Sequence, residues 1–237
     1  MPIKEYEDVN VIVVAAGDSK RFGGKIKKIF MEADKKPVIV RSVHNFTRIF
    51  KQESIIVVAA KEDMKKMRRV LDAAMLKKVR ITEGGSDRCL SVLNGLLEAD
   101  KERVLIHDGA RCFVPEKNIL EVCDSLKSGI SCSAPAVRPS ETARLFSGIK
   151  YELVDRERLY LMQTPQACRR EEYIKLLKES VRKKIIYTDD MEYFTRNNLK
   201  VMIVEGDKRN IKITTREDLN LLEEIIKKEK NVHRNWH

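Results

Sequence analysis

The feature of this sequence that most restricts its fold is a regular alternation between short apolar runs and longer amphipathic stretches. Runs such as VIVVAA at residues 11–16 and IIVVAA at 55–60 are rich in β-branched residues and are typical of buried strands. The expected strands occupy residues 9–16, 54–60, 79–82, 102–107, 131–137, 160–163 and 200–205. Because helical stretches separate these runs, the pattern predicts an α/β fold with a mostly parallel central sheet.

The expected helices lie between these strands. They cover residues 36–50, 62–76, 86–99, 115–128 and a last stretch that begins at Thr214 or Thr215. Pro37 and Pro115 suit the first turn of a helix, and Ser86 is a candidate N-cap. Since no Pro/Gly/Ser-rich linker and no internal repeat interrupts the pattern, we expect one domain spanning residues 1–237.

One segment, residues 138–159, does not fit the alternation. It contains two short strand-like pieces around Ser147-Gly148, which is a plausible hairpin turn. An isolated two-stranded hairpin is only marginally stable in water. We therefore expect this arm to pack on another surface, and a second subunit is the natural candidate.

The formal charge of +11 raises the question of a nucleic-acid partner. The chain shows no zinc-finger spacing and no RNP-like aromatic strand motif. Its lysines alternate with acids, as in KEDMKKMRR at residues 61–69. We interpret the charge as a solvated surface and expect no nucleic-acid partner.

The cysteines and the apolar runs indicate the cellular location of the protein. Five cysteines, none in a C-x-x-C pair, favour reduced thiols over a disulfide framework or a zinc site. No apolar run approaches the roughly 18 residues that span a bilayer. The first ten residues, MPIKEYEDVN, contain no apolar signal region. We expect a cytoplasmic protein without a membrane partner.

Three unusual loops follow predicted strands. They are the stretch after VIVVAA, with glycines at 17, 23 and 24; EGGSDRCLS at residues 83–91; and HDGAR at 107–111. In open α/β sheets, ligands bind at the carboxyl ends of the strands. These three loops are therefore expected to form one binding site.

The first loop matches neither common phosphate motif. A P-loop is excluded because Ser19 and Ile26 stand where a glycine and a Ser/Thr are required. The dinucleotide fingerprint fails at Ser19 and Phe22. The loop still combines glycines with Arg21 and Lys28, which suits an anion. The alternative is a plain strand–helix connection with exposed lysines.

Asp108 ends a predicted buried strand, where an unpaired carboxylate would be costly. It could bind a metal ion, accept a hydrogen bond from a substrate hydroxyl, or pair with Arg111 as a structural bridge. These three interpretations stay open from the residues alone.

A set of short motifs runs through the chain in a fixed order. The motifs are Ala15-Ala16-Gly17 with Arg21 and Lys28, Glu83 to Val92, His107 to Arg111, Glu141-Thr142, Val154-Asp155-Arg156, Thr164-Pro165-Gln166, Thr188-Asp189-Asp190 and Glu205 to Thr214. Together they resemble the cytidylyltransferases that couple CTP to a sugar-alcohol phosphate, the family of 2-C-methyl-D-erythritol 4-phosphate cytidylyltransferase. The resemblance spans almost the whole chain, and it implies a Rossmann-like three-layer sandwich with a protruding β-arm.

The chain departs from the family pattern at several positions. Ser19 replaces a glycine, and two extra residues precede Glu141. Lys27 replaces a proline, Ile29 a glutamine and Gly109 an alanine. Cys112 stands where the family has a second proline. Since the basic residues of the motifs are kept, we interpret the chain as a divergent but active enzyme. A non-catalytic nucleotide-binding protein is the alternative.

The resemblance implies a reaction in which a phosphate monoester attacks the α-phosphorus of CTP and pyrophosphate leaves. The implied product is CDP-methylerythritol, an intermediate of non-mevalonate isoprenoid synthesis. A ribitol-5-phosphate cytidylyltransferase is the rival within the same family. The HDGAR motif at residues 107–111 is nearer the form found in the isoprenoid enzyme than the form found in the ribitol-phosphate enzyme.

The resemblance also assigns site residues. It implies catalytic roles for Arg21, Lys28, Arg156 and Lys212. It implies nucleotide binding by Ala15, Ala16, Gly17, Gly84, Gly85, Ser91 and Gly109. It implies acceptor binding by Asp108, Arg111, Thr142, Arg156 and Lys212.

The implied cofactor is Mg²⁺, held mainly by the CTP phosphates with Asp108 as the nearest carboxylate. The implied assembly is a homodimer through the 138–159 arm. In that assembly, Thr142 and Arg156 would complete the site of the other subunit. Asp189 and Asp190 are interpreted as an acidic pair at a helix N-terminus.

Overall fold

All seven predicted strands form, and they share one sheet with an eighth strand. The structure is a computed structural model that describes residues 6–18 and 26–234. The strands of this sheet are β1 (Val9–Val14), β4 (Ile55–Ala59), β5 (Arg80–Glu83), β6 (Arg103–Asp108), β7 (Cys132–Val137), β10 (Leu161–Met162), β11 (Gln166–Arg169) and β12 (Val201–Glu205). The prediction of a single domain over residues 1–237 stays a prediction.

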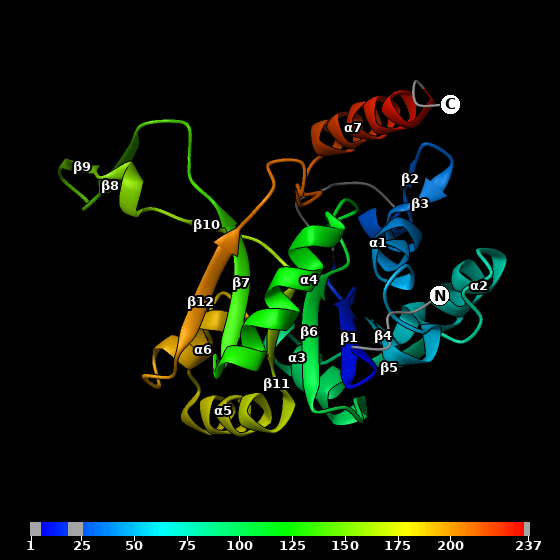
Figure 1. Ribbon diagram of the computed structural model, residues 1–237, viewed down its shortest axis with the longest axis horizontal. Coiled ribbons are helices and arrows are strands. Elements are labelled where there is room, and N and C mark those ends of the chain that lie inside the picture. Colours follow the sequence, from blue (N-terminus) through cyan, green and yellow to red (C-terminus); the bar gives the residue numbers. More distant parts are fainter. Residues whose placement is uncertain (1–5, 19–25, 235–237) are drawn as a thin grey trace.

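The sheet is mostly parallel around β1. β1 pairs in parallel with β4 and with β6, and β5 continues the sheet beyond β4. β12 pairs in parallel with β7. Antiparallel pairs join β11 to β6 and β7, and β10 to β7. The carboxyl ends of β1, β4, β5 and β6 therefore meet at one edge of the sheet (Figure 1).

β11 is the strand that the sequence pattern missed. Its four residues, Gln166–Arg169, begin and end with polar side chains, so no apolar run marks it. It forms because it fills the space between β6 and β7, with Ala167 opposite Leu105 and Cys168 opposite Cys132. Tertiary pairing decided this strand, not local preference.

The helices cover both faces of the sheet and create three layers. One face carries α1 (Val38–Thr47), α2 (Met64–Ala73) and α4 (Glu116–Ser125); the other carries α3 (Arg88–Glu98), α5 (Arg170–Lys183) and α6 (Asp190–Thr195). Along β1, Val11 and Val13 pack on the first face and Ile12 on the second, because successive strand residues point to opposite sides. The layers confirm the predicted Rossmann-like sandwich.

The C-terminal helix, α7 (Arg216–Arg234), packs apart from these two layers (Figure 1). Its Leu222 joins a small apolar cluster with Val38 and Ile213. Nearby lies a short hairpin of β2 (Glu32–Ala33) and β3 (Lys36–Pro37), which follows a 3₁₀ turn, η2 (Lys28–Phe30). These elements bring residues 28–30 to the sheet edge where β1 and β6 end.

The predicted N-cap of α3 was wrong. Asp87, not Ser86, caps the helix: its backbone is extended and its carboxylate accepts a hydrogen bond from the Leu90 N–H at 2.9 Å. Both residue types suit this position, and a carboxylate gains additionally from the helix dipole. Pro37 and Pro115 likewise stand just before α1 and α4, at the cap rather than in the first turn.

The predicted arm is present as a two-stranded antiparallel hairpin, β8 (Ala143–Phe146) and β9 (Tyr151–Val154). Figure 1 shows it standing clear of the layered body. Gly148 supplies the left-handed turn with φ of +85°. Large apolar side chains are exposed along the hairpin, namely Leu145, Phe146, Ile149, Tyr151 and Leu153. Such a patch marks an interaction surface.

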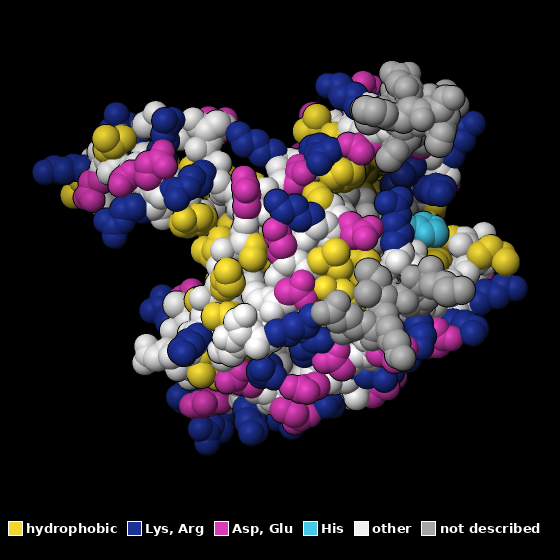
Figure 2. All heavy atoms as spheres, in the orientation of Figure 1, with side chains coloured by type: hydrophobic (Ala, Val, Ile, Leu, Met, Phe, Trp, Pro, Cys, Tyr) yellow, Lys and Arg dark blue, Asp and Glu magenta, His cyan; other side chains and the backbone are white. Residues whose placement is uncertain are grey.

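Two features concern the redox state of the thiols and the possibility of a membrane-spanning helix. All five cysteines are free, in line with the predicted reduced thiols, and all five are buried. Over residues 6–18 and 26–234, no helix has the length and apolar character needed to cross a membrane. On the face shown in Figure 2, basic and acidic side chains are interspersed.

Candidate active site

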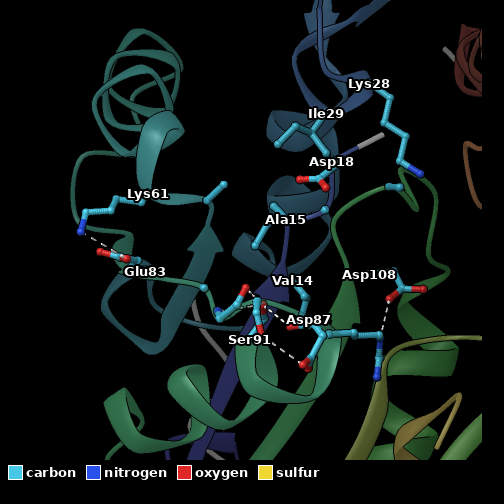
Figure 3. A pocket seen from close by; sticks show the side chains of 18 of the residues that line it. Val14, Ala15, Asp18, Lys28, Ile29, Lys61, Glu83, Asp87, Ser91 and Asp108 are labelled. Atoms are coloured by element: carbon cyan, nitrogen blue, oxygen red, sulfur yellow. Dashed lines mark hydrogen bonds and ion pairs between the residues drawn. The ribbon is translucent and has the colours of Figure 1, made fainter. Parts of the chain in front are cut away.

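The three predicted loops converge on one cavity of about 540 Å³ (Figure 3). They contribute residues 14–18, 83–88 with 91, and 108 with 110, and the cavity is completed by 60–62, Lys28, Ile29 and Lys212. The loops meet here because β1, β5 and β6 run in the same direction in one sheet. The predicted binding edge of the sheet is therefore hollow, and both basic and acidic side chains line it.

One wall of the cavity is formed by the backbone of the loop at Gly84 and Gly85. A Cβ added at Gly84 would lie 2.5 Å from the Ala16 Cβ, and one at Gly85 would lie 2.3 Å from the Leu90 Cβ. Both glycines are therefore packed too closely against the protein to carry a side chain. The Ser91 hydroxyl accepts a hydrogen bond from the Gly85 N–H at 3.1 Å and donates to the Asp87 carbonyl at 2.7 Å. These contacts hold the loop backbone in one shape at the cavity wall.

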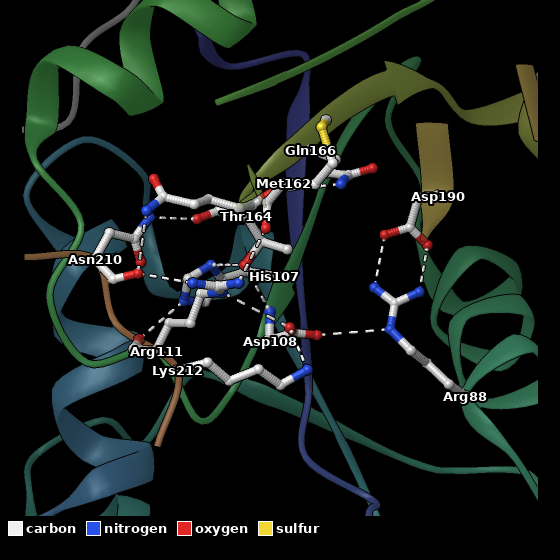
Figure 4. A network of polar contacts seen from close by, with 11 residues as sticks. Arg88, His107, Asp108, Arg111, Met162, Thr164, Gln166, Asp190, Asn210 and Lys212 are labelled. Atoms are coloured by element: carbon white, nitrogen blue, oxygen red, sulfur yellow. Dashed lines mark hydrogen bonds and ion pairs between the residues drawn. The ribbon is translucent and has the colours of Figure 1, made fainter. Parts of the chain in front are cut away.

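Asp108 lies at the cavity wall among three cations (Figure 4). Its carboxylate is 2.8 Å from the Lys212 Nζ, 3.5 Å from the Arg88 Nε and 3.8 Å from the Arg111 Nε. Burial alone would raise the pKa of Asp108, but these cations hold it well below its usual range. Asp108 therefore stays ionised, and the surrounding groups keep an excess of positive charge.

Arg88 connects Asp108 to a second, fully buried carboxylate. Its two Nη atoms bind both oxygens of Asp190 at 2.8 and 2.7 Å, and the Tyr173 hydroxyl donates to the same carboxylate at 2.6 Å. Figure 4 shows Arg88 between the two aspartates. The bidentate geometry holds the guanidinium in one orientation, so its Nε faces Asp108.

Sequence reasoning gave Arg88 no role and assigned Asp189 and Asp190 only to a helix N-terminus. The structure supports that interpretation for Asp189, which accepts from the Glu192 N–H at 2.9 Å and caps α6. For Asp190 it was incomplete, because its carboxylate points to Arg88. The sequence contained one signal: a helix has one N-cap residue, so only one of the two adjacent aspartates can occupy that position and the other is expected to have a different partner.

His107 holds the segment that carries Asp108. Its Nε2 lies 3.0 Å from the Arg111 carbonyl, which can only accept, so the proton is on Nε2. Its Nδ1 then accepts from the Thr164 hydroxyl at 2.9 Å, and that oxygen accepts in turn from the Asp108 N–H at 3.1 Å. Burial lowers the pKa of His107 to about 4, so the ring is neutral near pH 7.

This buried imidazole predicts a pH-dependent stability. An unfolded histidine takes up a proton near pH 6.5, whereas His107 resists it until about pH 4. Protonation therefore favours the unfolded chain as the pH falls between these values. We expect the contribution of His107 to the free energy of unfolding to fall by roughly 2–3 kcal/mol between pH 7 and pH 4.5.

The measurement is urea unfolding of the nucleotide-free protein at both pH values, in wild type and in His107→Gln. The variant should lose less stability on acidification by that amount. Equal losses in the two proteins would contradict a neutral, buried His107. His44→Gln is the comparison variant. Because His44 is only half-buried, its replacement should change the loss of stability on acidification less than His107→Gln does.

The cavity gathers most of the predicted site residues. Those that line it are Ala15, Ala16, Gly17, Lys28, Gly84, Gly85, Ser91, Asp108 and Lys212. Gly109 and Arg111 are adjacent but do not line it: the Gly109 N–H donates to the Val14 carbonyl at 2.9 Å, and Arg111 donates to the Asn210 carbonyl at 2.7 Å. Arg21 lies outside the described residues.

Thr142 and Arg156 are not brought to this cavity. Both are exposed and lie at the base of the arm, next to β8 and β9. Arg156 is near Glu157, with its Nε 3.7 Å from that carboxylate. Within one chain, the arm therefore keeps these two residues apart from Lys28 and Asp108.

The residues at the cavity wall are compatible with Mg²⁺ bound together with a substrate. In the part of the chain that the structure describes, no three His, Cys, Asp or Glu side chains cluster as a metal site. Asp108 is one of the carboxylates at the wall, and Lys212 already takes one of its oxygens. Mg²⁺ accepts such an arrangement, because it commonly keeps one or two carboxylates together with substrate phosphates.

This fold and this cavity place the chain among the α/β nucleotidyltransferases. The chain belongs to the 2-C-methyl-D-erythritol 4-phosphate cytidylyltransferase family, whose sequence model matches residues 9–228. It is 36% identical over 218 residues to the enzyme of that name from Geobacillus kaustophilus, covering 91% of this chain and 95% of the relative. The enzyme of Clostridium perfringens is 35% identical over 221 residues, covering 91% and 97%.

Solved structures show the same relationship. The 4-diphosphocytidyl-2C-methyl-D-erythritol synthase of Anaerococcus prevotii superposes with a TM-score of 0.80 at 25% identity, covering 93% of this chain and 99% of that one. The bifunctional IspDF of Campylobacter jejuni superposes at 0.74 and 28% identity, covering 90% of this chain and 53% of that one. These likenesses confirm the family that the ordered motifs indicated.

Proposed function

We propose that this protein transfers the cytidylyl group of CTP to 2-C-methyl-D-erythritol 4-phosphate, forming a CDP-alcohol for isoprenoid synthesis and releasing pyrophosphate. One observation supports this most directly: a single cavity combines the backbone of the Gly84-Gly85 loop with Lys28, Asp108 and Lys212. A nucleotide base, a triphosphate and a second phosphate each have a matching group there. A cytoplasmic location, favoured by the five free buried thiols, is part of the proposal.

The glycine loop would recognise the base. Gly84 packs against the Ala16 Cβ and Gly85 against Leu90, so this part of the cavity wall presents backbone. The backbone of this loop is held by Ser91, whose hydroxyl is engaged at Gly85 and Asp87. The Ser91 hydroxyl therefore acts mainly by fixing the shape of the loop, and hydrogen bonds from the loop backbone separate cytosine from uracil.

The chemistry needs charge neutralisation more than a general base. A phosphate monoester is largely dianionic at neutral pH, since its second pKa is near 6. One of its oxygens forms a bond to the α-phosphorus while the bond from that phosphorus to the β-bridging oxygen breaks, and pyrophosphate takes the electron pair. Lys28 and Arg21 would neutralise the charge that grows on the triphosphate, as cations do in phosphoryl transfer generally.

Asp108 and Lys212 would orient the substrates beside the reacting phosphorus. Lys212 is 40% exposed and 2.8 Å from Asp108, so the aspartate directs its amine while leaving donors for an acceptor phosphate. Mg²⁺, held by the triphosphate oxygens with Asp108 nearby, would supply further neutralisation when bound. The residues of this chain would then position the two polyanions and share in neutralising their charge.

We further propose that the enzyme works as a homodimer in which the arm of each subunit completes the site of the other. The exposed apolar side chains of the hairpin require a cover, and an isolated hairpin is marginal. Thr142 and Arg156 lie on this arm and would bring a second cation to the acceptor phosphate. The arm and the cavity thus become parts of one site.

A shared site predicts that two impaired variants restore each other. In a mixed dimer of Lys28→Ala and Arg156→Ala subunits, one of the two sites contains intact Lys28 and intact Arg156. After complete exchange at equal amounts, half of the dimers are mixed, so activity should return to about a quarter of the wild-type value. The assay is run at low acceptor concentration, where Arg156→Ala is slow. No recovery after proven exchange would exclude a shared site.

The function is tested by pyrophosphate release with CTP, Mg²⁺ and one of two acceptors. We expect rapid release with 2-C-methyl-D-erythritol 4-phosphate and slow release with ribitol 5-phosphate, and poor use of UTP or ATP in place of CTP. Faster turnover of ribitol 5-phosphate would overturn the proposed acceptor. CTP binding without transfer to either acceptor would overturn the proposed catalysis.

A further inference from the structure

Lys27, the residue before Lys28, makes two short ion pairs with a different part of the chain. Its Nζ lies 2.6 Å from a carboxylate oxygen of Glu62 and 2.6 Å from one of Asp63. The side chains of Lys27 and Asp63 are only 22% and 13% exposed. The contact therefore joins the end of the first loop to the segment that follows β4 across a partly buried junction.

The Asp63 carboxylate points to Lys27 and does not cap the helix that follows it. It occupies the N-cap position of α2, where a carboxylate commonly accepts a backbone N–H. No such side-chain hydrogen bond is made, and the carboxylate faces Lys27 instead. A second contact links the same two segments, since the Lys66 Nζ lies 4.2 Å from the centre of the Phe30 ring.

The contact acts on a short turn whose backbone is well defined. Lys27 has φ of −61° and ψ of 137°, just before the 3₁₀ turn η2. The Lys27 carbonyl accepts from the Phe30 N–H at 3.0 Å, and the Lys28 carbonyl accepts from the Met31 N–H at 3.1 Å. Ile29 and Phe30 are buried and anchor the far end of the turn. The Lys27 end is held by the two ion pairs.

Lys27 and Lys28 have different environments although they are adjacent. Lys28 lines the cavity, together with Glu62 on the neighbouring segment, whereas Lys27 does not line it. Burial alone would lower the pKa of Lys27, but its hydrogen bonds to Asp63 and Glu62 raise it above the usual value, so the amine keeps its charge. With two carboxylates at 2.6 Å, that charge is already neutralised within the protein.

We propose that the ion pairs of Lys27 with Glu62 and Asp63 form a clamp that fixes the backbone from which Lys28 reaches the triphosphate. Lys27 is thus a positioning residue for the reaction, and it acts through the η2 turn. This inference rests on the proposed function for Lys28. Misplacing a reacting or stabilising group by about 1 Å can cost up to a hundredfold in rate.

The test uses variants that separate the charge of Lys27 from its backbone. Lys27→Met removes both ion pairs at similar length and should lower kcat about tenfold, with a smaller change in the KM for CTP. Lys27→Pro also removes the charge, but its ring imposes φ near −65°, close to the observed −61°, so kcat should be largely kept. Asp63→Asn should resemble Lys27→Met.

Lys78→Met is the matched control. Lys78 also pairs with a glutamate, Glu53, at 2.9 Å, but it precedes β5 and lies at the other end of that strand from the cavity. Its loss should leave kcat unchanged. Thermal melts verify that each variant is folded before its kinetics are interpreted.

A second measurement does not depend on turnover. Hydrogen exchange at the Phe30 and Met31 amides reports the η2 turn directly, because these amides close it. Exchange should accelerate in Lys27→Met and Asp63→Asn, and stay slow in Lys27→Pro and Lys78→Met. If wild type forms no CDP-alcohol while this pattern holds, the proposed function fails and the clamp stands.

Two results would overturn the clamp. In the first, Lys27→Met matches Lys78→Met in both kcat and amide exchange, which would mean that the ion pairs hold nothing in place. In the second, Lys27→Pro is as slow as Lys27→Met, which would mean that the charge itself, and not the position of the backbone, serves the reaction.

Discussion

Replacing Lys28 with alanine should lower kcat by about 10²–10³, the range seen when one oxyanion-stabilising donor is removed. Lys28 lines the same cavity as the glycine loop that we assign to the base, and its proposed role is to neutralise charge that grows in the transition state. Its side chain is only half-buried, so the variant should keep nearly all of its stability. Steady-state kinetics with CTP and the acceptor, together with a thermal melt, measure both effects.

Lys61→Ala provides the matched control for Lys28. Lys61 lines the same cavity, but its side chain is 81% exposed and its nearest carboxylate, on Glu83, is 3.9 Å away. Loss of this charge should change kcat far less than the loss of Lys28. If Lys28→Ala keeps full turnover, or if the two variants are equally slow, Lys28 has no specific role in the transition state.

Replacing Arg88 with methionine should destabilise the protein by about 3–5 kcal/mol, the usual cost of breaking a buried ion pair from one side. Asp190 is fully buried, and without Arg88 its carboxylate would keep, among the residues that the structure describes, only the Tyr173 hydroxyl as a side-chain hydrogen-bond partner. For a chain of this length the melting temperature should fall on the order of 10 °C. Urea unfolding and a thermal melt measure the change.

Arg80→Met is the control for the Arg88 prediction. Arg80 pairs with Asp100 at 3.1 Å, but the Asp100 side chain is 60% exposed, so water replaces the lost partner. Its loss should cost no more than about 1 kcal/mol. The double variant Arg88→Met/Asp190→Asn should lose less than the two single losses combined, since no buried charge is left unpaired. Additive losses would show that the two residues do not stabilise each other.

The strands and the layered fold were predictable because each depends on a local pattern. β1, β4 and β6 contain continuous apolar runs at residues 11–14, 55–59 and 104–106, and such runs are typical of strands that are covered on both faces. β11 was not predictable in this way, since its four residues have no apolar run. The cap of α3 was missed for a related reason: Ser86 and Asp87 are both good caps, and only the backbone shows which one precedes the first turn.

The candidate site was predictable where its residues follow strands and unpredictable where they meet across elements. Lys28, Gly84 and Asp108 were assigned to one edge of the sheet because their loops follow predicted strands, and the cavity unites them. The pairing of Arg88 with Asp190 joins residues 102 positions apart, and neither residue's neighbours in the sequence indicate the other. Such a contact depends on how α3 and α6 pack on the same face of the sheet.

By itself, the sequence determined the class of fold, the family and the edge of the sheet that holds the site, because hydrophobic periodicity and ordered motifs are local properties of the chain. Tertiary structure decided the ionisation of Asp108, the neutrality of His107 and the partners of Lys27. Charge and burial at these side chains depend on groups that only folding brings within a few ångströms, since electrostatic interactions act through space and not along the chain.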